Sequence, residues 1–202
     1  EDVSYIFVGR DPRDVFMSLW NHYRNHVPAF FADLNGVPGR VGDPFPPCPD
    51  DIHELWQNWI TRGWFEWESD GYPYWSLLHH AQTWWEHRAL PNIQCVHYGD
   101  LLADLAGEIA RIAGFLGIEH SDEAFAGITE ACRFETAKKN ADRIVGDMSQ
   151  SFRAGNQTFF HRGTNGRWRD VLREEDLALY RQAMDRLPLD LARWLENGGP
   201  VA

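Results

Sequence analysis

The sequence has few cysteines and no long apolar runs, and both shortages limit what kind of protein it encodes. No stretch approaches 18 uninterrupted apolar residues, so we expect no membrane span, and no signal peptide is recognisable. Cys48, Cys95 and Cys132 are odd in number and far apart, without CxxC spacing. This cysteine usage predicts a reduced, cytoplasmic protein, and no His/Cys spacing indicates a metal site.

Positive charge is also scarce. Lys and Arg number 19 against 30 Asp and Glu, which gives a formal net charge of −11, and no long basic run is present. Such a molecule repels nucleic acid and anionic membranes as a whole, so we expect neither as a partner. An anionic ligand would need a local positive pocket within this acidic background.

Aromatic residues, in contrast, are abundant. A chain of 202 residues with 44 % hydrophobic content predicts one domain over 1–202 with one core. Ten Trp and twelve Phe exceed what such a core requires. Packing inside irregular helical layers is the favoured role for most of them, and the others can line a concave apolar site.

The first 25 residues predict a strand that leads into a helix. Residues 4–8 form a short apolar run bounded by Gly9. Asp11 suits an N-cap and Pro12 the first helical position, so we expect a helix from there to about Tyr23.

The remainder predicts further helices around a second strand at 92–97. We expect helices over 51–67 and 75–87 with a turn at 70–74 between them, a helix from an Asp100 cap to Gly117, and helices over 123–132 and 174–194. Segments 34–51 and 140–167 are predicted to be long and irregular. This order indicates an α/β fold with a parallel sheet. Because two strands make a poor sheet and the chain has no initiator Met, we expect further strands upstream.

The start of the first helix has the features of an anion site. Arg10 lies where a strand ends and a helix begins, beside free backbone N–H groups and the positive end of the helix dipole. Arg10, Asp14 and Ser18 are spaced i, i+4, i+8, and a guanidinium and a hydroxyl can both donate to phosphate. The alternative, an Arg10–Asp14 surface ion pair with Ser18 merely tolerated, is equally compatible with this spacing.

A second donor-rich segment lies at 159–169, with the sequence FFHRGTNGRWR. Its Arg and His side chains, together with Gly163 and Gly166, can close over an anion. A solvated basic loop is the alternative. Tyr98, at the end of the second strand, and Phe134, between a helix and a loop, are candidates for nucleotide contact, although each taken alone is more typical of a packed aromatic.

These segments together resemble a known family. YIFVGRDPRDVFMSL resembles the 3′-phosphate-binding motif of sulfotransferases that use 3′-phosphoadenosine-5′-phosphosulfate (PAPS), and HRGTNGRW resembles their late RKGxxGxW motif. SLLHHAQTWWEHR and NIQCVHYGDLLADLAGEIARIAGFLGI are similar to the segments between, in the same order. The resemblance covers about residues 3–182. It implies a P-loop-NTPase-like parallel sheet flanked by helices, with the N-terminal strands and the phosphate loop missing from this chain.

The resemblance also implies a role for individual residues. Arg10 and Ser18 match the ligands of the 3′-phosphate, and Arg162 and Gly163 match the Lys/Arg and Gly of the late loop that returns to it. His161 stands where the family usually has Arg.

The aromatic positions match as well. Tyr98 matches a tyrosine near the nucleotide and Phe134 the aromatic that stacks on adenine. Cys132 lies where a hydroxyl residue is common, and Trp168 is expected to pack.

The implied activity is transfer of a sulfuryl group from PAPS to a small hydroxylated acceptor, without a metal. Residues 34–51 and the aromatics of 55–75 are expected to line part of the acceptor site. The sequence has no GxxxxGK[ST]-like or PKSGTT-like stretch, so the catalytic residues stay unassigned. His79 and His80 are candidates for the base by residue type only, and a structural role is favoured for both.

Two other functions are compatible with these residues. A non-catalytic module that binds 3′-phosphorylated adenosine is the main alternative. A P-loop kinase relative is disfavoured by the late loop and by the missing Walker segment. The family's dimerisation signature is not evident in RDVLREEDLA, so no oligomeric state is predicted.

Overall fold

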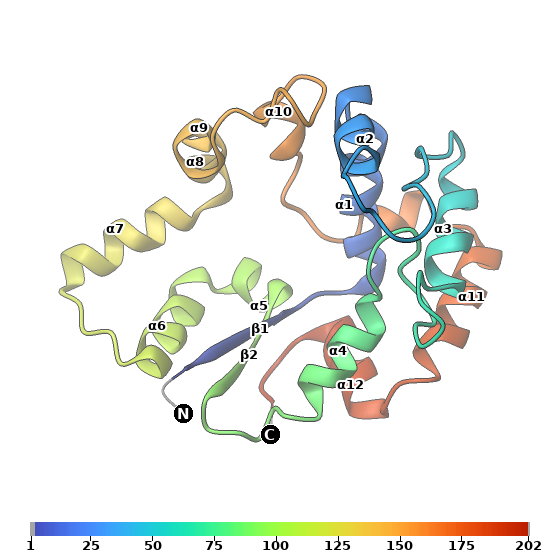
Figure 1. The fold of residues 1–202 in the computed structure, drawn as a ribbon. Helices are drawn as coiled ribbons and strands as arrows, with labels where there is room; N and C mark the ends of the chain where they lie inside the picture. Colours follow the sequence, from blue (N-terminus) through green and yellow to red (C-terminus); the bar gives the residue numbers. More distant parts are fainter. Residues whose placement is uncertain (1–2, 202) are drawn as a thin grey trace.

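The computed structural model describes residues 3–201 and has an α/β architecture with a small parallel sheet flanked by helices (Figure 1). Strand β1 (Tyr5–Gly9) pairs in parallel with β2 (Ile93–His97), from Tyr5 opposite Ile93 to Gly9 opposite His97. Both strands lie where the sequence predicts them. Within the described residues the sheet has these two strands, and Ile6 and Val8 of β1 remain exposed.

Helix α1 (Pro12–Asn25) follows β1 and begins as predicted. The Asp11 carboxylate accepts the Arg13 backbone N–H at 2.8 Å, which fixes the first turn, and Pro12 lacks an N–H to satisfy. Phe16 and Tyr23 on its inner face are fully buried. The helix therefore projects from the carboxyl end of β1 with its position set by the core.

Three helices lie between α1 and β2: α2 (Pro28–Asn35), α3 (Ile52–Thr61) and α4 (Leu77–Trp85). The prediction of a helix to residue 67 is wrong, because the Glu68 carboxylate accepts the backbone N–H groups of Trp64 and Phe65. The segment predicted to be irregular over 34–51 is irregular over 36–51, because residues 34 and 35 form the end of α2. The turn at 70–74 is also present, and its buried Asp70 accepts the N–H groups of Leu77 and Leu78 at the start of α4.

Helices α5 (Tyr98–Ala103) and α6 (Leu105–Leu116) follow β2 where one helix was predicted. The assignment of Asp100 as the cap is wrong. Asp104 has a non-helical backbone and its carboxylate accepts the Gly107 N–H at 2.9 Å, so Asp104 caps α6. Asp100 instead accepts the Gly199 N–H from the last residues of the chain. Gly117 ends α6 in the left-handed conformation, as predicted.

The last 80 residues form α7 (Asp122–Cys132), α8 (Phe134–Lys139), α9 (Ala141–Val145), α10 (Asn156–Phe159), the 3-10 helix η1 (Arg167–Asp170), α11 (Glu174–Met184) and α12 (Leu189–Asn197). Segment 140–167 is thus interrupted by two short helices that the prediction lacks. The predicted single helix over 174–194 is two helices. Pro188, which has no N–H for a helical hydrogen bond, precedes α12.

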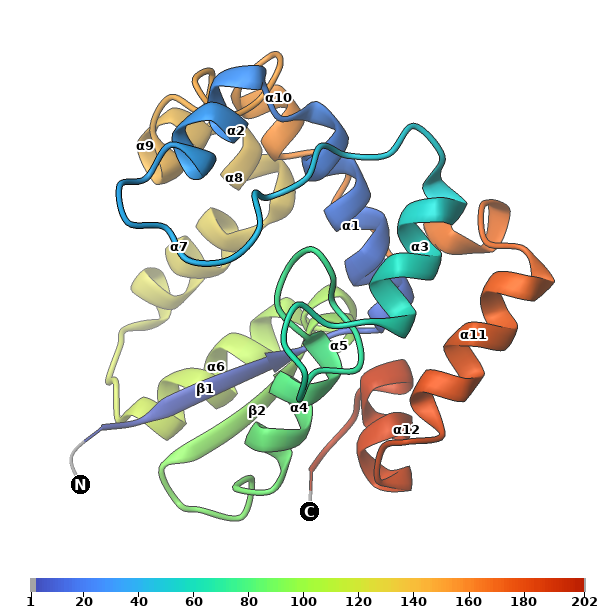
Figure 2. The same cartoon turned by 45° about the vertical axis from the view of Figure 1, so that its right-hand side comes forward.

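The core lies between the sheet and the helices α1, α3, α4, α11 and α12, which group together in Figure 2. Trp84 and Trp194 contact Phe7 of β1, so α4 and α12 cover one face of the sheet. Gly9 is required there, because a Cβ would come within 2.3 Å of the Trp194 ring. No helix of the described part of the chain is long and apolar enough to cross a membrane.

Candidate nucleotide site

The carboxyl ends of the two strands bring Arg10 and Tyr98 together. Gly9 and His97 are partners in the sheet, so the residues that follow them leave the same edge side by side. The Arg10 guanidinium carbon lies 4.1 Å from the centroid of the Tyr98 ring. At this distance the ring face attracts the cation and holds its plane.

The late loop is docked onto this strand end. Arg10 Nε and Nη2 donate to Asn165 Oδ1 at 3.0 and 2.8 Å, and Nη2 also donates to the Thr164 carbonyl at 3.1 Å. Asp14 Oδ1 accepts the Gly166 N–H at 2.7 Å. Within the described residues, Asp14 therefore binds loop backbone and forms no ion pair with Arg10.

Phe134 and Gly163 lie against each other, although 29 residues separate them in the sequence. Gly163 has a φ of +64°, and a Cβ on it would come within 2.5 Å of the Phe134 ring. The close approach and the left-handed backbone both require glycine. The loop passes over the start of α8, so the ring of Phe134 has a fixed neighbour on that side.

Basic side chains concentrate around this loop. Burial and the nearby charges of Arg10 and Arg162 lower the pKa of Arg167. Burial and the charges of Arg167, Arg162 and Lys138 lower the pKa of His161, whose Nδ1 accepts a hydrogen bond from Arg167 Nη1 at 3.2 Å. The lowered pKa values show that these cationic groups lie close enough to repel one another, so the potential around the loop is positive. An anionic ligand needs such a local positive region in a chain of net charge −11.

The structure does not engage Ser18 in this network. Ser18 is half-buried on α1, two turns after Arg10, and its hydroxyl has no hydrogen-bond partner in residues 3–201. Trp168 packs against the core as predicted, with the Arg13 guanidinium 4.1 Å from its ring centroid. Arg167 lies among the Arg side chains that the sequence predicts for this loop. Asn165 also takes part, although the sequence predicts no role for it; its place between Gly163 and Gly166 was the available signal.

An apolar pocket of about 350 Å³ lies apart from these residues, between α2 and the loops on either side of α3. Its lining is aromatic and aliphatic: Phe30, Leu34, Phe45, Trp64, Phe65, Pro73, Tyr74 and Trp75. The aromatic lining of this pocket suits a ligand with an apolar body.

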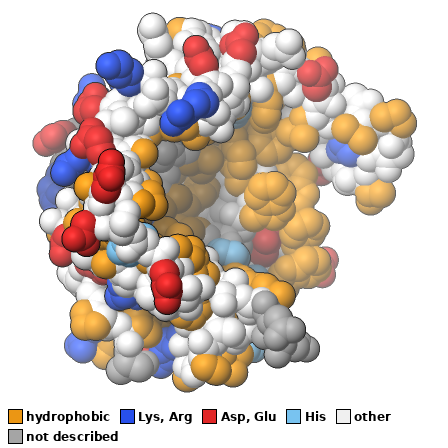
Figure 3. Space-filling view, turned by 90° about the vertical axis from the view of Figure 1, so that its left-hand side faces the viewer, with side chains coloured by type: hydrophobic (Ala, Val, Ile, Leu, Met, Phe, Trp, Pro, Cys, Tyr) orange, Lys and Arg blue, Asp and Glu red, His pale blue; other side chains and the backbone are white. Residues whose placement is uncertain are grey.

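Figure 3 shows the face of the molecule on the side of Figure 1 where α7 lies. Hydrophobic side chains gather along the wall of a deep hollow on this face.

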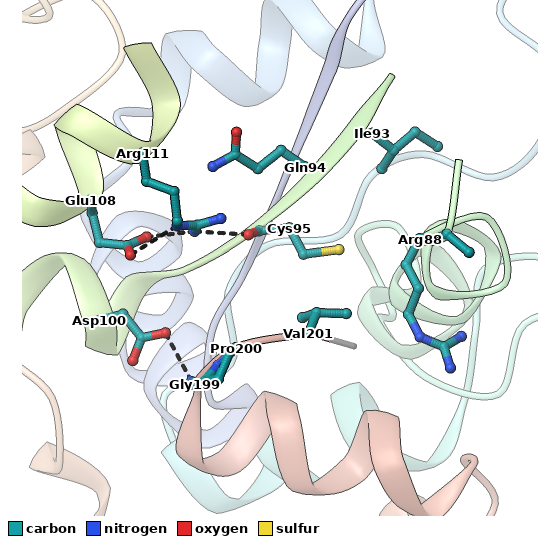
Figure 4. A pocket seen from close by; sticks show the side chains of 11 residues that line it. Arg88, Ile93, Gln94, Cys95, Asp100, Glu108, Arg111, Gly199, Pro200 and Val201 are labelled. Atoms are coloured by element: carbon teal, nitrogen blue, oxygen red, sulfur yellow. Dashed lines mark hydrogen bonds and ion pairs between the residues drawn. The ribbon is translucent and has the colours of Figure 1, made fainter. Parts of the chain in front are cut away.

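A more polar pocket of about 520 Å³ lies along β2, next to the last residues of the chain (Figure 4). Its charged groups have protein partners, and Arg88 pairs with Asp190, which lies outside the pocket lining. Arg111 binds Glu108 and the Cys95 carbonyl, and Asp100 accepts the Gly199 N–H. None of the candidate donor-site residues lines it: Arg10, Ser18, Tyr98, Phe134 and residues 161–163 all lie elsewhere. Its size alone therefore does not make it the candidate nucleotide site. No group of three potential metal ligands occurs in the described residues.

Comparison with known proteins places this geometry in a family. The family model of the sulfotransferase domain matches residues 1–193, so the chain belongs to the sulfotransferase domain family. The glycolipid sulfotransferase of Mycobacterium bovis is 29% identical over 211 residues, which cover 97% of this chain and 64% of that protein. A glycolipid sulfotransferase of Mycobacterium tuberculosis is 29% identical over 214 residues, with the same coverage.

Solved structures agree on the fold. Retinol dehydratase in complex with androsterone and the inactive cofactor PAP is 26% identical, with a TM-score of 0.62 over 93% of this chain and 49% of that one. Mouse sulfotransferase SULT7A1 complexed with PAP, at 19% identity, has a TM-score of 0.67 over 95% of this chain and 62% of that one. The chain thus spans less than two thirds of the length of these relatives.

Proposed function

We propose that this protein is a sulfotransferase that takes a sulfuryl group from PAPS and transfers it to an acceptor hydroxyl. In this proposal residues 1–202 belong to one sulfotransferase-type domain and carry the 3′-phosphate and adenine part of the donor site. The observation that carries it is Arg10, held on Tyr98 at the end of the sheet by the late loop. The three free cysteines fit a cytoplasmic location.

Arg10 and Arg162 would bind the 3′-phosphate, with His161 and the Ser18 hydroxyl as further donors. Ser18 is free to donate, and the cations around His161 attract a phosphate dianion. Phe134 would stack on adenine from the side opposite its contact with Gly163. The relatives solved with PAP, which carries this 3′-phosphate, support the assignment.

In the reaction, the bond between sulfur and the phosphate oxygen breaks while a bond from sulfur to the acceptor oxygen forms. The acceptor proton passes to a general base, and PAP leaves. Such transfers depend on in-line positioning and on stabilising the charge of the moving group. The residues proposed above bind the 3′-phosphate and adenine end of the donor, which does not react. Their contribution is therefore to position the donor.

The apolar pocket at Phe45, Trp64 and Tyr74 would hold the body of the acceptor. It is lined by Leu34 and Phe45 from segment 34–51 and by residues between 64 and 75, within the two regions, 34–51 and the aromatics of 55–75, that the sequence suggests for this role. An apolar molecule with a hydroxyl and a sugar of the glycolipid type both suit aromatic walls. The names of the mycobacterial relatives favour the second.

Calorimetric titration with PAP and with AMP tests the proposal, because the two nucleotides differ in the 3′-phosphate. We expect wild-type protein to prefer PAP. Arg10→Ala should lower PAP affinity by about 10-fold or more, since it removes a charge-assisted contact, and should leave AMP affinity nearly unchanged. Equal affinity of wild-type protein for both nucleotides would contradict the proposal.

A further inference from the structure

The Asn165 side chain contacts the guanidinium of Arg10 directly. A guanidinium has five N–H bonds. In this structure Nε and Nη2 of Arg10 are occupied by Asn165 Oδ1 and the Thr164 carbonyl, while the Tyr98 ring lies against the guanidinium face. Nη1 donates to no residue within 3–201. The edge of Arg10 that remains for a ligand is therefore set by the contact with Asn165.

The acceptor on this edge of Arg10 is a neutral amide. A carboxylate could also accept from Nε and Nη2 of arginine. It would orient the guanidinium as well as the amide does, but its negative charge would cancel the positive charge of the guanidinium. The nearest carboxylate of α1, Asp14, is instead engaged by the Gly166 N–H at 2.7 Å. Arg10 is thus oriented by three hydrogen bonds to neutral acceptors. No carboxylate of residues 3–201 forms an ion pair with it, and the charges of Asp14 and Asp11 act on it only from a longer distance.

We infer that Asn165 is a positioning residue for the 3′-phosphate of the donor, acting through Arg10. It fixes the guanidinium so that Nη1 faces the ligand, and it ties the late loop to the end of β1 without neutralising the site. This inference rests on the proposed function. Asn165 falls on an unspecified position of RKGxxGxW, so the resemblance assigns it no role.

Asn165→Asp changes the charge at this position while the shape of the side chain stays nearly the same. The carboxylate keeps an acceptor for Arg10 Nε and Nη2 but pairs with its charge. We expect calorimetry to show PAP affinity reduced by about 10-fold or more, AMP affinity changed by less than about 2-fold, and an unchanged or higher Tm. Asn165→Ala frees the guanidinium, and we expect a smaller loss of PAP affinity, about 2- to 10-fold.

Asn58→Asp is the matched control, because it makes the same change of charge on α3, where the Asn58 side chain donates to the Glu54 carbonyl and not to the late loop. It should bind both nucleotides like the wild type. If Asn165→Asp keeps the wild-type ratio of PAP to AMP affinity while Arg10→Ala loses it, the inference is wrong and the proposed function stands. Equal weakening of both nucleotides with a lower Tm in Asn165→Asp would indicate a merely structural residue and also overturn the inference. No preference for PAP in the wild type would overturn both.

Discussion

Gly163 shows how much of the site depends on a single residue without a side chain. Its backbone is left-handed, with φ +64°, and it lies directly against the ring of Phe134. The turn places Arg162 on one side, and Thr164 and Asn165 on the other, where they reach Arg10. A change at this position would act together on the phosphate contact and the adenine contact that we propose.

We expect Gly163→Ala to lower PAP affinity by about 10-fold and to cost about 1–3 kcal/mol of stability, because the methyl group meets the Phe134 ring and the φ is strained. Titration with PAP and urea unfolding measure the two effects. Gly127→Ala is the control. A Cβ at Gly127, inside α7, meets nothing within 4 Å, and its φ is not left-handed. It should keep PAP affinity and gain about 0.5–1 kcal/mol in stability. Equal behaviour of the two variants would contradict the prediction.

On the scale of elements, two histidines of α1 bind the backbone of segment 146–160 by hydrogen bonds. The His22 ring donates to the Phe159 carbonyl at 3.3 Å, and the His26 ring donates to the Ser151 carbonyl at 3.0 Å. His26 also stacks on Phe30, with ring centroids 3.6 Å apart. Burial lowers the pKa of both histidines, so the folded chain favours the neutral form of both rings.

This attachment should weaken in acid. A histidine whose folded pKa lies below its unfolded value of about 6.5 contributes its full stability above that pH. The contribution is lost as the pH falls from there through the folded pKa, because the unfolded chain takes up protons first. We expect the Tm to fall between pH 7.5 and pH 5.

His26→Asn tests the origin of this loss, because the amide can still donate to Ser151 but does not titrate. We expect a shallower fall of the Tm with decreasing pH than in the wild type. His79→Asn, on an exposed position of α4, should leave the wild-type slope unchanged. The same slope in wild type and His26→Asn would contradict the assignment.

The sequence predicted the elements whose signals are local. The apolar run before Gly9, the Asp11 cap and the left-handed Gly117 are such signals, and all three hold. The divisions at Asp104 and Pro188 were missed because the apolar periodicity continues across them. The contacts of Asn165 with Arg10 and of Gly166 with Asp14 join residues more than 150 positions apart, so no local pattern carries them.

Over the whole molecule, charge is distributed unevenly. The chain has a net charge of −11, yet Arg10, Arg162, Arg167 and Lys138 gather around the late loop. At 0.1 M salt the Debye length is about 10 Å, so a nucleotide farther away than this is screened from both the net negative charge and the basic residues. In dilute buffer the screening is weaker, and the net negative charge of the molecule repels the approaching nucleotide. In the proposed site the nucleotide would contact these cations directly.

The uneven charge has a consequence for the timing of nucleotide exchange. Added salt weakens long-range repulsion, so PAP should associate faster. The same salt weakens the contacts in the pocket, so PAP should also dissociate faster, and the two changes partly cancel in the Kd. Stopped-flow tryptophan fluorescence at about 20 and 300 mM salt measures both rates. An association rate that falls with salt would mean that the pocket's own field reaches further than the repulsion. Otherwise the acidic surface sets how often a nucleotide arrives, and the basic loop sets how long it stays.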